Sequence, residues 1–160
     1  MCHLFIIGSI LVAYLSSPPD SDYVKLQRTR CYGTCPAYSV TVFAGGKVVY
    51  VGEHFVKVTG KRSYTVRKAT VRRLFQSIQK MNFFSLASEF LKEKRVRTKP
   101  DGTIDTLLVD VTDSPTRYIT VRIGNRLKTV KNYYGGPPEL EELEVSIDKV
   151  AQTSKWVKGK

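Results

Sequence analysis

Two cysteines separated by three residues constrain the fold of this 160-residue chain more than any other feature. In an extended strand, Cys31 and Cys35 would lie about 13 Å apart. A disulfide requires Cα atoms within roughly 7 Å of each other, so a bond between these two cysteines requires the chain to reverse between them. Gly33 permits the φ angles of a tight reversal, and Pro36 prevents the turn from continuing as a helix. The segment is therefore predicted to be a tight loop.

Three kinds of chemistry are open to this loop, whose other motif residues are Tyr32, Thr34 and Tyr38. The first is a structural disulfide, which would add about 2 kcal/mol by closing so short a loop. The second is thiol redox chemistry, although the spacing is one residue longer than C-x-x-C and a strand pattern follows in place of a helix. The third is copper binding by both thiolates and His54, because C-x-x-x-C-P resembles the copper site of the thioredoxin-like chaperones of cytochrome oxidase assembly.

The same segment carries a wider resemblance. The run C-Y-G-T-C-P-x-Y-S-V-T-V-F from Cys31 to Phe43 is followed by a Gly-Gly turn and Val48–Gly52, and weaker matches follow in order as far as Trp156. Over roughly residues 23–157, the chain resembles an uncharacterised bacterial domain-of-unknown-function family of small exported proteins. The resemblance implies a shared fold and export. It implies no established activity.

The distribution of charge favours an anionic partner. The chain has 26 Lys and Arg against 14 Asp and Glu; residues 23–132 hold 22 of the cations and 7 of the acids, while five acids lie within 139–148. Such a field attracts nucleic acid, lipid headgroups or acidic polysaccharide. The alternative is a basic surface without a dedicated partner. We expect the anion-binding surface to comprise Arg62, Arg67, Arg72, Arg73, Lys94, Arg95, Arg97 and Lys99.

The N-terminal residues favour export. The apolar run Leu4–Leu15 is too short to span a bilayer comfortably and matches the length of a signal-peptide core. No Lys or Arg precedes it, and no A-x-A cleavage triplet follows, so an N-terminal element docked on the core is the alternative. We predict a signal peptide or N-terminal anchor over 1–19 and a single domain over 20–160. An exported protein would meet anionic envelope material, whereas a cytosolic one would meet nucleic acid.

Hydrophobic periodicity predicts an α+β fold. Period-two alternation indicates strands over 23–29, 38–43, 47–51, 55–58 and 63–66, with Gly45-Gly46 as a two-residue hairpin turn. Period-3.6 patterns indicate helices over 68–81 and 138–152, the second starting at Pro137-Pro138. A charged loop is expected over Lys92–Lys99, followed by a three-stranded meander in which Leu107, Val109 and Val111 face inward.

These elements predict an antiparallel sheet of six or seven strands with both helices on one face. One core should bury Leu74, Ile78, Val109, Val121, Leu143 and Ile147.

Residues for catalysis are not evident. The chain has no G-x-S-x-G, H-E-x-x-H, P-loop or G-x-G-x-x-G motif. Asp113 is expected to bond the backbone of its own turn, and the acids over 139–144 are expected to serve a helix start. Stacking for nucleic acid would come from Tyr32, Tyr133 and Tyr134. We therefore expect a monomeric, non-enzymatic binding or structural protein without a cofactor.

Overall fold

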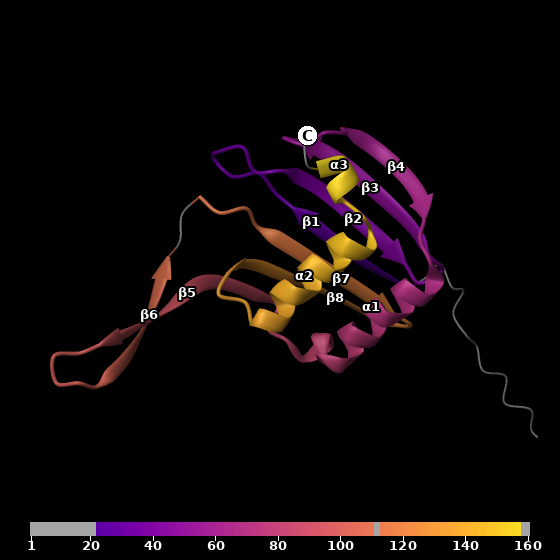
Figure 1. The fold of residues 1–160 in the computed structure, drawn as a ribbon. Helices are drawn as coiled ribbons and strands as arrows, with labels where there is room; N and C mark the ends of the chain where they lie inside the picture. The colour runs from indigo at the N-terminus through magenta and orange to yellow at the C-terminus, as the bar shows by residue number, and fades with distance from the viewer. Residues whose placement is uncertain (1–21, 111–112, 158–160) are drawn as a thin grey trace, which may run out of the picture.

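The structure is a computed structural model that describes residues 22–110 and 113–157. The predicted signal peptide over 1–19 lies outside these residues, and so does Val111. Figure 1 shows two layers, a twisted sheet and helices α1 and α2 lying across one of its faces. This is the predicted α+β architecture. Within the described residues, no helix combines the length and the apolar character needed to cross a bilayer.

The described strands hydrogen-bond in the order β4-β3-β2-β1-β7-β8-β5-β6. Neighbours are antiparallel except β5 and β8, which run parallel. The strands are β1 (Tyr23–Arg28), β2 (Ala37–Phe43), β3 (Lys47–His54), β4 (Gly60–Thr65), β5 (Glu89–Thr98), β6 (Ile104–Asp110), β7 (Arg117–Ile123) and β8 (Arg126–Tyr134). The helices are α1 (Lys68–Lys80), the 3-10 turn η1 (Phe83–Ser85), α2 (Pro138–Val150) and α3 (Ser154–Val157).

A single core fills the space between the helices and the sheet. The inward positions of five strands alternate with outward polar ones, as period two requires. The fully buried apolar strand residues are Val24, Leu26, Ala37, Val40, Val42, Val48, Tyr50, Ile119, Val121 and Val130. The helices add the buried side chains Val71, Leu74, Ile78, Leu140, Leu143 and Ile147. Five of the six residues predicted to share this core do so, the exception being Val109.

The prediction of a charged loop over residues 92–99 is wrong. This segment is the second part of β5, which pairs with β6 in a two-stranded hairpin that projects beyond the helices (Figure 1). Charged side chains are tolerated there because neither face of the hairpin is covered by a helix, and Arg97 lies opposite Asp105. The predicted meander is correct for β7 and β8, which pair antiparallel, but wrong for β6, which pairs with β5 and not with β7. Leu107 is therefore exposed, and Val109 is only half-buried.

Two local predictions also fail. The turn between β2 and β3 spans residues 44–46, and only Gly46 has positive φ, at 98°. Its amide donates to Phe43 O at 2.9 Å, so the turn is centred on Ala44 and Gly45, one residue earlier than the predicted Gly45-Gly46 turn. Phe55–Val58 is a bend in place of a strand, because Phe55 adopts φ 51° and Val58 N bonds Trp156 O at 3.0 Å.

Candidate functional site

The Cys31–Cys35 disulfide closes the loop between β1 and β2. The two Cα atoms are 5.6 Å apart, so the chain reverses between them as predicted. Pro36 then leads directly into β2, without a helix. Both cysteines are half-buried, and the three residues between them are exposed. The predicted pairing is confirmed, and we call residues 31–35 the stapled loop.

A second segment of the chain holds the stapled loop from the side. The backbone N–H of Tyr32 donates to Asp113 Oδ1 at 2.6 Å. Next to it, Thr29 N donates to Thr116 O at 3.0 Å, and Thr116 N donates to Thr29 Oγ1 at 2.9 Å. Asp113 therefore bonds a backbone group 81 residues away. We had expected it to bond the backbone of its own turn. The loop is fixed by one covalent bond and by this lateral contact.

Beneath the loop, polar side chains join β1 and β2 to α2. Arg28 Nη2 donates to Asp148 Oδ2 at 2.9 Å, and the Tyr38 hydroxyl donates to Asp148 Oδ1 at 2.8 Å. Thr153 Oγ1 donates to the same Oδ1 at 2.8 Å. Burial, together with the charge and hydrogen bond of Asp148, raises the pKa of Tyr38 far above its usual value, although Arg28 opposes this. Tyr38, the last residue of the cysteine motif, therefore has a structural partner on α2.

Glu144 forms the deeper half of this network. Its carboxylate, 4% exposed, accepts from Arg117 Nε at 2.9 Å and from Asn132 Nδ2 at 2.8 Å. Arg28 Nη1 lies 3.4 Å from Oε2, the oxygen that Arg117 Nε contacts. Burial raises the pKa of Glu144, while Asn132, Arg117 and Arg28 act in the opposite direction. Among the acids over 139–144, Glu139 and Glu141 occupy the first turn of α2 as expected, but Glu144 is a buried ion-pair partner.

Sequence reasoning missed this network, although a signal for it was present. Glu144 and Asp148 are four residues apart and flank Ile147 on the buried stripe of α2. Arg28 continues the inward alternation of Val24 and Leu26 on β1. Charged residues at positions that the periodicity assigns to the core require partners when they are buried. Opposite charges at two such positions indicate that they pair.

A small hollow of about 250 Å³ lies beside the stapled loop. Two tyrosines contribute to its lining, Tyr32 from the loop and Tyr133 from β8. Tyr133 also accepts a hydrogen bond from Ser114 N at 3.2 Å. The remaining lining residues are Arg30, Cys31, Asp113 and Ser114. The hollow is therefore polar and aromatic, with no aliphatic side chain in its lining.

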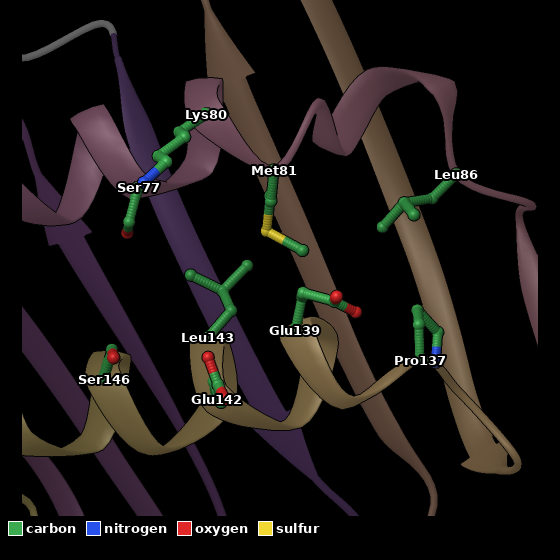
Figure 2. Close-up of a pocket in the computed structure, with 9 residues that line it drawn as sticks. All are labelled: Ser77, Lys80, Met81, Leu86, Pro137, Glu139, Glu142, Leu143 and Ser146. Carbon is green, nitrogen blue, oxygen red and sulfur yellow. The ribbon is translucent and has the colours of Figure 1, made fainter.

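A larger cleft of about 480 Å³ separates the end of α1 from the start of α2. Figure 2 shows Met81 and Leu143 pointing toward each other across it, with Pro137 at one end. Glu139 and Glu142 contribute carboxylates. An apolar centre with polar groups around it is usual for small-ligand sites. Glu139 is also accounted for by the helix start, because a carboxylate in the first turn interacts favourably with the helix dipole.

The predicted anion-binding surface divides into two groups at opposite edges of the sheet. One edge strand is β4, which α1 follows directly, and the other is β6 of the projecting hairpin (Figure 1). The first group consists of Arg62, Arg67, Arg72 and Arg73, and the second of Lys94, Arg95, Arg97 and Lys99. The two groups do not form one surface.

The two groups also differ in their neighbours. In the hairpin, Asp105 lies 3.5 Å from Arg97 and 3.9 Å from Lys99. Between Glu53 and Glu89, the chain carries eight Lys and Arg and no Asp or Glu. We call these eight residues the β4–α1 basic segment: Lys57, Lys61, Arg62, Arg67, Lys68, Arg72, Arg73 and Lys80. All eight are exposed, and the ion pairs of the described residues include none of them.

The residues of the copper hypothesis are not assembled as a site. The sulfurs of Cys31 and Cys35 are bonded to each other, and His54 is exposed at the end of β3. Across the part of the chain that the structure describes, no three His, Cys, Asp or Glu side chains form a group able to hold a metal ion. A strand follows Cys35, so the loop also lacks the helix dipole that activates thioredoxin-type thiols.

Together these features define a class of protein: a small α+β domain in which a stapled loop is anchored to a helix by buried ion pairs. Residues 22–151, from the start of β1 to the end of α2, match the family model described as domain of unknown function DUF6438. The chain belongs to this family, which agrees with the resemblance seen in the sequence. Comparison with curated proteins gave no match.

Proposed function

We propose that this protein is an exported, non-enzymatic binding protein that contacts acidic polysaccharide of the cell envelope through its β4–α1 basic segment. The observation that carries the proposal is the eight exposed cations of that segment, with no acid among them in the sequence. A local field of one sign concentrates a polyanion at the surface and speeds its association. The hairpin cations fit this role less well, because Asp105 lies beside both Arg97 and Lys99 and offsets part of their charge.

The burial of α1 favours a polyanion in solution over a lipid bilayer. A helix that lies on a membrane inserts a free apolar face into the headgroup region. The apolar residues Val71, Leu74 and Ile78 of α1 are instead buried against the sheet. Within the described residues, none of the large apolar side chains that are exposed lies on β4 or α1. Cationic and polar groups therefore dominate what this surface offers to a partner.

The disulfide supports the proposed compartment. Disulfides persist in secreted, periplasmic and surface proteins and are rare in the cytosol. The Cys31–Cys35 bond therefore agrees with the apolar run Leu4–Leu15 as an export signal. Cell fractionation of a tagged protein, followed by N-terminal sequencing, tests this directly. Full-length protein recovered from the cytosol would contradict export and would make nucleic acid the polyanion to examine.

Binding to polygalacturonate tests the proposed partner. The double substitution Arg72→Gln/Arg73→Gln should weaken binding by about tenfold, and wild-type binding should weaken as salt rises above about 0.1 M. The matched control is Arg97→Gln/Lys99→Gln, which removes the same charge from the hairpin and should change binding less. Equal losses in both variants would contradict the assignment to β4–α1. Stronger binding to phosphatidylglycerol vesicles than to polygalacturonate would identify a lipid surface as the partner.

A further inference from the structure

The most exposed aromatic side chain among the described residues is Tyr32, at the tip of the stapled loop. Its side chain is 95% exposed, yet its backbone is held on both sides. Cys31 and Cys35 are bonded around it, and its N–H donates to Asp113 Oδ1 at 2.6 Å. Gly33 N also donates to Cys31 Sγ at 3.3 Å. The restraint therefore fixes the backbone from which Tyr32 projects, while its side chain packs against almost nothing in its own chain.

An exposed tyrosine on a restrained backbone is suited to contact with a ligand. Tyrosine offers a large amphipathic surface with few rotatable bonds, so little conformational entropy is lost when it becomes ordered. Restraint of the backbone before binding reduces this loss further. The disulfide joins residues only four positions apart, so chain entropy limits its contribution to overall stability to about 2 kcal/mol. Its main consequence is the local shape of the loop around Tyr32.

The hollow beside the loop indicates the chemistry of the ligand. At about 250 Å³ it is smaller than the 300–1,000 Å³ of drug-sized pockets, which leaves room for roughly one ring. Arg30 offers a planar fork of donors that pairs with a carboxylate. Asp113 and the Tyr133 hydroxyl offer acceptors for hydroxyl protons. A phosphate group lacks the hydroxyl donors that such acceptors require, and an aliphatic ligand would meet no aliphatic wall.

We propose that this hollow is a sugar-binding subsite for one uronate residue of an acidic polysaccharide. Tyr32 stacks on the apolar face of the pyranose ring, Arg30 pairs with its carboxylate, and Asp113 and Tyr133 accept its hydroxyl protons. The inference rests on the proposed function, because it assigns the ring recognition that the β4–α1 basic segment cannot supply. The segment attracts any polyanion, whereas the subsite selects a sugar.

Calorimetric titration of the full chain with two probes tests the subsite. Oligogalacturonate supplies both rings and charge, and polyphosphate of the same total charge supplies charge alone. Tyr32→Ala should weaken oligogalacturonate binding by about tenfold, the loss usual for an anchoring aromatic, and should leave polyphosphate binding unchanged. Phe55→Ala, which removes another exposed ring outside the hollow, should change neither. Folding of Tyr32→Ala should be unaffected, because the side chain is not packed.

The outcomes separate the two proposals. Equal binding of oligogalacturonate by Tyr32→Ala and wild type would overturn the subsite, and so would an equal loss toward both probes. Wild-type protein that binds polyphosphate but not oligogalacturonate would also overturn it. Wild-type protein that binds neither probe would overturn the proposed function and the subsite with it. The variant Cys31→Ser/Cys35→Ser retains Tyr32 without the staple, and wild-type affinity in that variant would show that the restraint plays no part in binding.

Discussion

Arg28 and Tyr38 lie directly opposite each other at the ends of β1 and β2, and both bind one carboxylate, that of Asp148 on α2. Arg28 Nε also donates to the Tyr38 hydroxyl at 3.0 Å. The two strands that enter and leave the stapled loop are thereby tied to each other and to the helix layer. The position of the loop depends on these three side chains as well as on the disulfide.

Replacement of Asp148 with asparagine should destabilise the protein by about 2–3 kcal/mol, because it removes the nearer of the two carboxylate charges that a largely buried Arg28 faces. Urea unfolding at neutral pH measures the change. Asp105→Asn is the matched control on the hairpin, where ion pairs with exposed partners contribute about 0–1 kcal/mol. Similar losses in the two variants would show that the Asp148 contacts are no stronger than ordinary surface pairs.

The stability of the protein at alkaline pH should depend on the ionisation of Tyr38. Burial and Asp148 raise its pKa in the folded state above the ordinary value of 10.0. Above about pH 10 the unfolded chain therefore loses a proton that the folded chain retains, and stability falls as pH rises. Burial is the main cause that raises the pKa values of Tyr50 and Tyr64 as well. Their ionisation therefore also lowers the stability of the folded protein as pH rises.

Tyr38→Phe removes one of these protons, so its stability should decline less steeply than that of wild type, by up to about 1.4 kcal/mol per pH unit. Urea unfolding between pH 9 and pH 11 gives both slopes. Parallel slopes would mean that Tyr38 ionises as easily in the folded protein as in the unfolded one.

The disulfide predicts the thiol content of the unfolded protein. A full-length Cys2→Ser variant, unfolded without reductant, should show no free thiols, since Cys31 and Cys35 are the only other cysteines. Cys35→Ser in this background should lower the free energy of unfolding by about 2 kcal/mol. Two free thiols, or copper retained in stoichiometric amount at purification, would instead favour thiol or metal chemistry at the loop.

Gly46 connects the β2–β3 turn to the start of α1. Its φ is 98°, and an added Cβ would lie 2.8 Å from Val66 O, while its own carbonyl accepts from Val66 N at 2.9 Å. Gly46→Ala should therefore cost about 1–2 kcal/mol or more in thermal or urea unfolding. Gly45→Ala, at the preceding turn residue without positive φ, should cost less. A larger loss at Gly45 would contradict the assigned turn geometry.

Hydrophobic periodicity predicted the helix and sheet layers well, because an element that buries one face must place apolar residues at regular intervals. The stripe Val71, Leu74 and Ile78 on α1 could be read directly, since it must face the sheet. The β5–β6 hairpin could not be predicted in the same way, because no helix covers it and its side chains follow no apolar alternation. The charges that indicated a loop are accommodated there by cross-strand pairing, as with Arg97 and Asp105.

The candidate site was predictable only in part. The reversal is required once Cys31 and Cys35 are bonded to each other, but Gly33, which we expected to supply a special φ, is not among the described glycines with positive φ. The contact of Tyr32 with Asp113 joins residues 81 positions apart, and no local pattern specifies such a pair. The division of the cations likewise depends on strand order, because β4 and β6 become opposite edges only after β8 has paired with β5.

The parallel pairing of β5 with β8 has a consequence for how the molecule opens. Only three positions, Glu89 to Leu91, join β5 to β8, and the rest of the hairpin contacts its own partner strand. The outer part of the hairpin, residues 92–98 and β6, can therefore open as a separate cooperative unit of low local stability, while Glu89 to Leu91 stay paired with β8 and Phe90 stays against the core. Its backbone amides should exchange with solvent deuterium well before those of β1 and β7, at the centre of the sheet.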